Sequence, residues 1–302
     1  RGADMGELDL IKGFRKSAPT HPFITVGPGH DCAVLSWPAD RDLAYKIDQI
    51  VEGTHFVLSG PGAATAQQVG WKAMAKACSD IAATGFWPVA ATVAINLRKG
   101  SSEELARGVY QGLSDCCRRF SIGLAGGDIS VSDNGLSVAV SLLGEGPKGG
   151  AWLRSGARTG DVLLVTGTLG GSLGSGKHLD FTPRLEEARN IRKLSPDGVH
   201  ACIDITDGLS RDLHHICQES HCGAVVFEDS IPCVQRDLTS KEIQSCSKSA
   251  LCDGEDFELL LAVSPEAAEH LLSSQKDPLP LTKIGMILPV NDGLLLAAAD
   301  GR

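Results

Sequence analysis

The chain has 302 residues, of which 28 are basic and 37 acidic, and its formal net charge is −9. This excess of acidic side chains argues against a nucleic-acid-binding protein, because such proteins neutralise phosphates with clustered Lys and Arg. Its composition, 42% hydrophobic and 22% charged, is typical of a folded globular protein, and no apolar run reaches the roughly 18 residues of a membrane helix. We therefore expect a cytoplasmic protein of about two domains, with neither nucleic-acid nor membrane partners.

Strand-like and helix-like segments alternate throughout the chain, which predicts a mixed α/β fold. In the helix predicted over 65–84, apolar residues recur every four positions until Gly85 ends the pattern. The dipeptide Asn134-Gly135 is a strong signal for an antiparallel hairpin. The predicted elements are a strand over 43–51, the helix over 65–84, a strand over 89–97, a helix capped by Ser101 and a hairpin over 129–143.

A glycine-rich segment over 144–150 is typical of a domain linker. We therefore predict an N-terminal domain over 1–150 and a C-terminal α/β domain over 151–302. The elements predicted in the second domain are strands over 162–165 and 201–205, a helix from Asp207, a strand from Ala224 and a strand over 257–263.

The ten cysteines do not form a recognisable zinc or disulfide pattern, since no C-x-x-C occurs. His214, His215 and His221 could complete a metal site with Cys217 and Cys222, but the usual ligand spacing is absent. Buried, reduced thiols are the simpler expectation.

Six aspartates stand beside glycine or at the ends of predicted elements: Asp31, Asp48, Asp80, Asp128, Asp204 and Asp207. Structural roles are open to them, because Asp31 and Asp128 could form turns and Asp207 could cap a helix. Asp80 is harder to explain in this way, because it falls in the last turn of its helix, where the helix dipole disfavours a carboxylate; an ion pair with Lys76 is one alternative. Converging carboxylates without a matching lysine cluster suit Mg²⁺, which binds oxygen ligands together with substrate phosphates.

A possible phosphate-binding loop lies further along the chain. Residues Gly171–Lys177 fit the pattern G-x-x-x-x-G-K, but His178 follows where Ser or Thr should bind magnesium. Pro183 also leaves little room for the long helix that would face the phosphates. We expect a close-packed turn and a short helix here instead.

Taken together, these motifs resemble the thiamine-monophosphate kinase family, of the superfamily that includes aminoimidazole ribonucleotide synthetase and selenophosphate synthetase. The resemblance follows the chain in order through the segments 5–11, 48–56, 70–75 with 79–85, 126–128, 154–157 with 160–162, 204–209 and 254–259. It implies an N-terminal mixed-sheet domain that forms a barrel with a second subunit, and therefore a homodimer. It also implies that the N-terminal domain binds ATP and magnesium.

The resemblance implies an enzyme that transfers the γ-phosphate of ATP directly to thiamine monophosphate, giving thiamine diphosphate. Several Mg²⁺ ions would be bound by the six aspartates, with Asp48, Asp80, Asp128 and Asp207 closest to the chemistry. ATP would be contacted by Gly127, Asp128, Arg154 and Thr206, and thiamine monophosphate by His55 and Asp256. Such a transfer requires positioning and charge neutralisation rather than a protein nucleophile.

The chain departs from the family pattern at several positions. His30 and Ile47 stand where the family usually has metal-binding side chains, and no C-terminal aromatic tail follows Asp300. Two alternatives follow: another ATP-using enzyme of the superfamily, making selenophosphate or aminoimidazole ribonucleotide, or a relative that binds nucleotide without catalysis.

Overall fold

The computed structural model describes residues 17–26, 34, 35, 37–233, 240–274 and 281–298. Its internal contacts divide the chain into two compact units that meet in sequence at Gly149 and Gly150. Two short segments cross this division, because residues 82–86 pack with the second unit and residues 179–182 with the first. The predicted ligand Asp31 lies outside the described residues.

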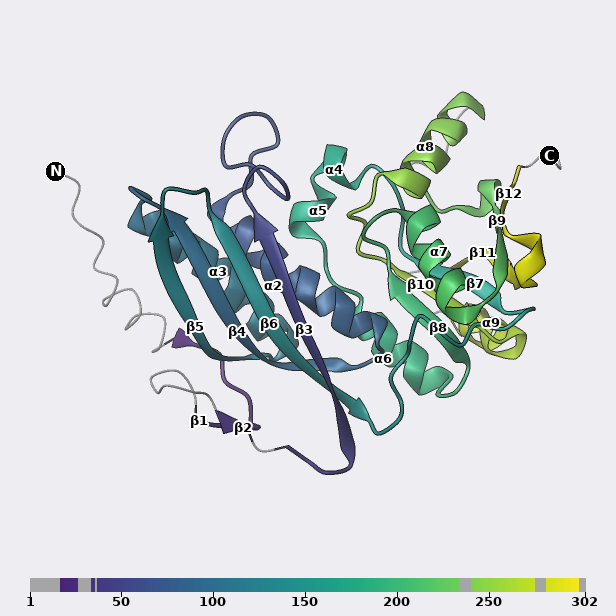
Figure 1. Ribbon diagram of the computed structural model, residues 1–302, viewed down its shortest axis with the longest axis horizontal. Coiled ribbons are helices and arrows are strands. Elements are labelled where there is room, and N and C mark those ends of the chain that lie inside the picture. Colours follow the sequence, from purple (N-terminus) through teal and green to yellow (C-terminus); the bar gives the residue numbers. More distant parts are fainter. Residues whose placement is uncertain (1–16, 27–33, 36, 234–239, 275–280, 299–302) are drawn as a thin grey trace. The chain divides into compact units, whose positions relative to one another are not determined.

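The first unit is built on a four-stranded mixed sheet in the order β3-β6-β4-β5, with helices α2 and α3 against one face (Figure 1). Its main elements are β3 (Arg41–Val51), α2 (Ala66–Ala83), β4 (Trp87–Arg98), α3 (Glu103–Phe120), β5 (Gly123–Ser132) and β6 (Ser137–Pro147). Two short strands, β1 (Ile24–Val26) and β2 (Val34–Leu35), form a separate antiparallel pair. The predicted strands over 43–51 and 89–97 and the helix over 65–84 are confirmed.

The predicted hairpin over 129–143 is wrong. The chain does turn at Asn134-Gly135, but β5 pairs with β4 in parallel, and β6 pairs with β4 and β3 instead of with β5. The Asn-Gly signal is local: it reverses the chain but does not choose the strand with which β6 pairs. Here α3 joins β4 to β5 as a parallel β-α-β unit, and β6 pairs with the other side of β4, so that β4 lies between β5 and β6. The turn is held beside β4 and the end of β3 by hydrogen bonds from the Asn96 side chain to Gly135 O and from Leu136 N to Glu52.

Among the residues that the structure describes, no helix covers the other face of this sheet, and that face is partly apolar. Side chains alternate along β3, so that Leu43, Tyr45 and Ile47 are 48%, 74% and 68% exposed. On the neighbouring strand β6, Val138, Val140 and Leu142 are buried on the helix-covered face. The first unit therefore has one packed face and one face without a covering layer among the described residues.

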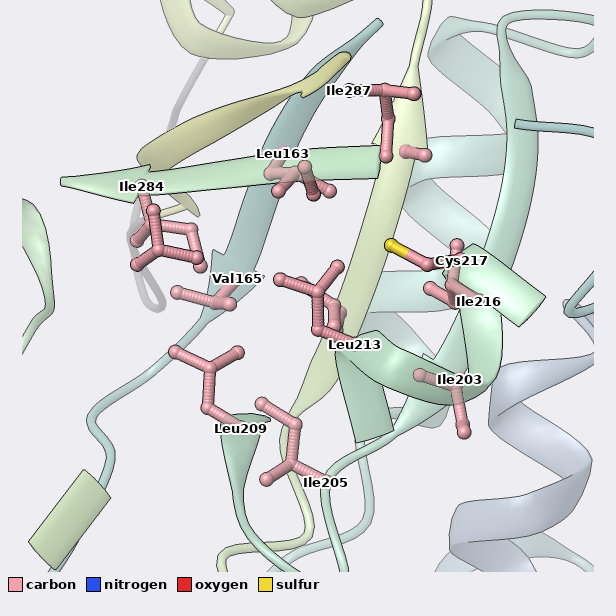
Figure 2. Close-up of a cluster of buried hydrophobic side chains, with 14 of the residues drawn as sticks. Leu163, Val165, Ile203, Ile205, Leu209, Leu213, Ile216, Cys217, Ile284 and Ile287 are labelled. Atoms are coloured by element: carbon pink, nitrogen blue, oxygen red, sulfur yellow. The ribbon is translucent and has the colours of Figure 1, made fainter. Parts of the chain in front are cut away.

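The second unit contains a six-stranded mixed sheet in the order β12-β9-β11-β7-β10-β8, in which only β12 and β9 are parallel. Its strands are β7 (Val162–Thr166), β8 (Val199–Asp204), β9 (Gly223–Phe227), β10 (Leu259–Val263), β11 (Leu281–Leu288) and β12 (Leu294–Ala297). Its helices include α6 (Leu185–Leu194), α7 (Leu209–Ser220), α8 (Ser240–Cys252) and α9 (Pro265–Ser273). Figure 2 shows Leu213 and Ile216 of α7 packed with sheet residues such as Leu163 and Ile203 in one buried cluster.

Two predicted helix caps are displaced by one residue. The side chain of Ser102, rather than Ser101, accepts the Leu105 amide at the start of α3. Gly208, rather than Asp207, is the N-cap of α7, and no side chain caps that end. None of the helices in the described ranges has the length and apolar character needed to span a membrane.

The glycine-rich segment after β7 forms two short helices, α4 (Ser172–Ser175) and α5 (Lys177–Asp180), as expected. The expectation that every cysteine is reduced is wrong, because Cys233 and Cys246 form a disulfide. The other described cysteines are free thiols, and they are Cys78, Cys116, Cys117, Cys202, Cys217, Cys222 and Cys252.

Candidate functional site

Two of the predicted metal ligands lie together in the first unit. Lys46 Nζ is 3.0 Å from Asp80 Oδ2 and 3.9 Å from Asp48 Oδ2, and Lys76 Nζ is 2.9 Å from Asp48 Oδ1. Both carboxylates are partly exposed, at 14% and 24%. The sequence predicts, as one alternative, an ion pair between Asp80 and Lys76, and it indicates no matching lysine cluster. Asp80 instead pairs with Lys46, and two lysines accompany the two aspartates.

This pair of carboxylates can supply two oxygen ligands to a magnesium ion. Among the residues that the structure describes, no group of three or more His, Cys, Asp and Glu side chains is arranged to hold a metal. Mg²⁺ does not need such a cage, because it usually binds one or two carboxylates and takes its other ligands from water and substrate phosphates. The ammonium of Lys46 already lies where two carboxylates attract a cation.

Asp128 does not join this pair within the first unit. Strand pairing puts Asp48 in one row with Val140, Val93 and Gly127, whereas Asp128 lies in the next row with Ala94. Asp48 and Asp128 also lie on the two outer strands, β3 and β5, which are three strand spacings or about 14 Å apart. Val93 is buried against the helices while Asp128 and Ala94 are exposed, so Asp48 and Asp128 belong to opposite faces of the sheet.

His55 lies in a turn that follows β3, and its imidazole ring forms a hydrogen bond that stabilises this turn. Its Nδ1 accepts the Val51 amide at 3.1 Å, which leaves the proton of the neutral ring on Nε2. The backbone oxygen of His55 accepts a hydrogen bond of 2.7 Å from Nζ of Lys72, a fully buried residue of α2. Lys72 was missed by sequence reasoning, although a lysine inside an apolar helix pattern could have drawn attention to it.

In the second unit, Thr206 and Asp207 lie on the loop between β8 and α7, and Asp204 comes just before that loop. Asp204 ends β8 and its side chain is buried, whereas Asp207 is 53% exposed and lies 3.5 Å from Arg211. Arg154 is exposed. One buried and one exposed carboxylate thus lie within four residues, at the end of β8 and on the loop that follows it.

A buried side chain of α7, Asp212, accepts hydrogen bonds from this loop. This residue was not identified from the sequence. Its Oδ2 accepts the amides of Thr206 at 2.9 Å and Asp207 at 3.0 Å. Burial raises the pKa of Asp212 to about 6; the two amides and the Arg154 charge lower it, and the Asp207 charge raises it.

Asp256 lies on a strained loop before β10. The flanking residues Glu255 and Phe257 have φ values of 56° and 52°, in the left-handed region that non-glycine residues rarely adopt. Asp256 is fully buried, and both of its carboxylate oxygens are 3.0 Å from the Gly170 amide. Burial raises its pKa to about 6; the Gly170 amide and Lys177 oppose this shift.

Glu258, two residues further on, is a buried anchor that sequence reasoning did not identify. It accepts hydrogen bonds from Thr166 Oγ1 at 2.7 Å, from Lys177 Nζ at 2.8 Å, and from the Arg184 guanidinium at 2.6 and 2.7 Å. A buried carboxylate with this many donors is well satisfied. The lysine of the apparent phosphate-binding pattern is therefore engaged by Glu258, which agrees with the sequence argument against a P-loop.

Comparisons with known proteins identify the family. Residues 29–145 match the N-terminal domain of AIR synthase related protein, and residues 158–293 match the C-terminal domain. The thiamine-monophosphate kinase of Rhodopirellula baltica is 36% identical over 293 residues, covering 93% of this chain and 89% of the relative. That of Escherichia coli K12 is 31% identical and covers 96% of this chain and 92% of the relative.

Solved structures agree with these matches. The thiamine-monophosphate kinase of Stenotrophomonas maltophilia K279a has a TM-score of 0.81 at 29% identity, covering 98% of this chain and 97% of its own. A structure described as AaThiL complexed with AMPPCP and TMP has a TM-score of 0.72 at 27% identity, covering 99% and 94%. Hydrogenase maturation protein HypE, at 19% identity and a TM-score of 0.78, shares the fold alone. Because both halves match and relatives more than 30% identical span nearly its whole length, this chain belongs to the thiamine-monophosphate kinase family of AIR synthase related proteins.

Proposed function

We propose that this chain phosphorylates thiamine monophosphate to thiamine diphosphate by direct in-line transfer of the γ-phosphate of ATP. The relatives that span nearly the whole chain are named for this activity, and one related structure is described with AMPPCP and TMP. The observation in this chain that carries the proposal is the pair of carboxylates, Asp48 and Asp80, gathered around the Lys46 ammonium.

The reaction requires positioning more than it requires a nucleophile from the protein, because the acceptor phosphate is already ionised. Mg²⁺, when bound, would neutralise charge on the phosphates. Asp48 and Asp80 of the first unit, and Asp204 and Asp207 of the second, are each proposed as metal ligands. Asp31 and Asp128 complete the proposed set of metal ligands; since Asp128 lies apart from Asp48 and Asp80, it would bind at a separate position.

The remaining proposed contacts divide between the two substrates. Gly127, Asp128, Arg154 and Thr206 would bind ATP, and the planar guanidinium of Arg154 suits a phosphate group. His55 would donate from Nε2 to thiamine monophosphate, because its Nδ1 is engaged by the Val51 amide. Asp256, held rigidly by Gly170, would contact the same substrate.

We also propose that the chain forms a homodimer through the open face of the first sheet. Leu43, Tyr45 and Ile47 expose apolar surface in one row along β3, on the face that α2 and α3 leave uncovered. Pairing with a second copy would remove that surface from water.

The direct test is to incubate the purified chain with ATP, Mg²⁺ and thiamine monophosphate and to separate the products by chromatography. We expect thiamine diphosphate and ADP in equal amounts, and no thiamine diphosphate when unphosphorylated thiamine replaces the acceptor. A protein that melts cooperatively but forms no product above a no-enzyme control would overturn the proposal. ADP release with a different acceptor would assign the chain to another reaction of the superfamily.

A further inference from the structure

The loop that carries Thr206 and Asp207 is fixed from two sides. On one side, Asp212 Oδ2 accepts the amides of both residues, at 2.9 and 3.0 Å. On the other side, the Glu255 amide donates to Thr206 O at 2.8 Å. The peptide groups around Thr206 therefore have partners at both ends, which fixes the path of the backbone that carries its side chain.

The Glu255 amide that donates to Thr206 belongs to the strained loop that carries Asp256. Phe257 N donates to Ile205 O at 2.9 Å, and Ile205 N donates to Glu258 O at 2.8 Å. The loop over 204–208 and the loop over 254–258 are thus joined by backbone hydrogen bonds, and Asp212 supplies the side-chain contact that completes the arrangement.

Asp212 does not serve its own helix in this contact. It is the fourth residue of α7, whose N-cap is Gly208, and in a capping box an acidic side chain of the first turn accepts the amide of the N-cap residue. Its carboxylate instead reaches the amides of the two residues that precede the N-cap. Asp212 is only 2% exposed. Burial of a carboxylate costs free energy, and the hydrogen bonds from the two loop amides offset part of that cost.

We infer that Asp212 is a positioning residue for nucleotide binding: its carboxylate aligns the Thr206 and Asp207 peptides so that their side chains face the nucleotide and its metal ion. The inference rests on the proposed function, which assigns Thr206 to ATP and Asp207 to Mg²⁺. Asp212 itself touches neither substrate in this scheme. Its removal should weaken the binding of nucleotide more than that of thiamine monophosphate.

The experiment compares Asp212→Ala, Asp212→Asn and Asp212→Glu with the unmodified chain. The first removes the acceptor, the second keeps one acceptor oxygen without charge, and the third keeps the charge but moves it by one methylene. Asp161→Ala is the matched control, because Asp161 is also a buried aspartate of the second unit. It accepts the Arg158 amide at 2.7 Å and pairs with His200 at 2.9 Å.

The first readout is the Kd of AMPPCP with Mg²⁺, measured by calorimetry on protein whose thermal melt shows that it is folded. We expect Asp212→Ala and Asp212→Glu to raise this Kd by about tenfold or more, because two loop amides lose or change their acceptor. Asp212→Asn should return it to within about threefold of the unmodified value, since the amide oxygen accepts the same bonds. Asp161→Ala should lower the melting temperature and leave the Kd unchanged.

The second readout is kinetic. In Asp212→Ala the KM for ATP should rise about tenfold while the KM for thiamine monophosphate changes by less than about threefold. An Asp212→Ala protein that binds AMPPCP as the unmodified chain does, or an equal loss in Asp161→Ala, would overturn the positioning role alone. If Asp212→Ala does not fold, Asp212→Glu decides by the same criterion. Failure of the unmodified chain to bind AMPPCP would overturn the proposed function as well.

Discussion

At the scale of single residues, the most informative contact is the one that Lys46 makes with Asp80 and Asp48. An ion pair between partly exposed side chains contributes only about 0–1 kcal/mol to stability. Stability alone therefore gives a weak reason for two aspartates and two lysines to gather here. A site that receives a metal–nucleotide complex gives a stronger one.

Asp80→Asn should separate these explanations. We expect the rate of thiamine diphosphate formation to fall by about 100-fold or more, because the variant loses a charge that balances the metal ion. Its melting temperature should stay within about 2 °C of the unmodified value. Steady-state kinetics and a thermal melt measure the two effects.

The control for this variant is Asp115→Asn, which removes another aspartate that pairs with a basic residue, Arg118, at 3.1 Å on α3. Asp115→Asn should change neither the rate of thiamine diphosphate formation nor the melting temperature. Retention of full activity by Asp80→Asn would return Asp80 to a structural role.

Asp256 allows a test of stability against pH. Its pKa is raised to about 6 by burial, above the value of about 3.9 in an unfolded chain. The folded state therefore binds this proton more tightly, and the protein loses stability as the pH rises from about 4 to about 6, with no further loss above that range. Asn at this position has no proton to lose and can still accept the Gly170 amide.

Asp256→Asn should therefore gain stability relative to the unmodified chain as the pH rises. The difference in free energy of unfolding should be small near pH 4 and reach about 2–3 kcal/mol above pH 7. The same variant should bind thiamine monophosphate more weakly. Urea unfolding at pH 5 and pH 8 measures the first effect, and a difference that is equal at both pH values would contradict it.

At the scale of elements, α2 and α3 approach each other so closely that only glycine fits at the contact. A Cβ atom on Gly70 would collide with Val109 O, and one on Gly112 would collide with Gln67 O. These are backbone atoms, so neither helix can relieve the collision by turning a side chain. The two helices pack through reciprocal glycines, each facing the backbone of the other helix.

Gly112→Ala should therefore lower the melting temperature by about 5 °C or more, because the helices must separate or the backbone must bend. Gly174→Ala in α4 is the matched control, since no atom lies within 4 Å of the added Cβ and the backbone has no positive φ. That variant should change stability by less than about 0.5 kcal/mol. Equal melting temperatures for the two variants would show that the helix contact tolerates a methyl group.

Helix and strand positions were largely predictable at this scale, and strand partners were not. The period of apolar residues placed the helix over 65–84 within a residue or two of α2 (Ala66–Ala83). The Asn134-Gly135 dipeptide indicated a reversal of the chain, which occurs. It could not indicate that β4 would lie between β5 and β6, because that depends on the parallel pairing which α3 imposes.

At the scale of the whole molecule, the open face of the first sheet raises the question of assembly. We expect the chain to sediment as a dimer in analytical ultracentrifugation, since Leu43, Tyr45 and Ile47 would otherwise remain in water. The double variant Leu43→Glu with Tyr45→Glu should sediment as a monomer, because two buried charges would oppose the contact.

Val290→Glu is the control, because Val290 is 59% exposed and belongs to the second unit. It should leave the dimer intact. A monomeric unmodified chain, at the concentrations used for the kinase assay, would rule out this assembly.

The sequence by itself determined the class of fold, the order of most elements and the family, because these depend on local periodicity and on short motifs that occur in a fixed order along the chain. It also placed Asp48 and Asp80 among the candidate metal ligands, and the family resemblance added Asp256 as a substrate contact. Tertiary structure alone decided which charges meet: it paired Asp80 with Lys46, separated Asp128 from Asp48, and brought Asp212 and Glu258 into contact with loops that sequence reasoning treated separately. The physical reason is that burial and partnership are properties of residues distant in sequence, and a carboxylate's role depends on which donors and charges surround it.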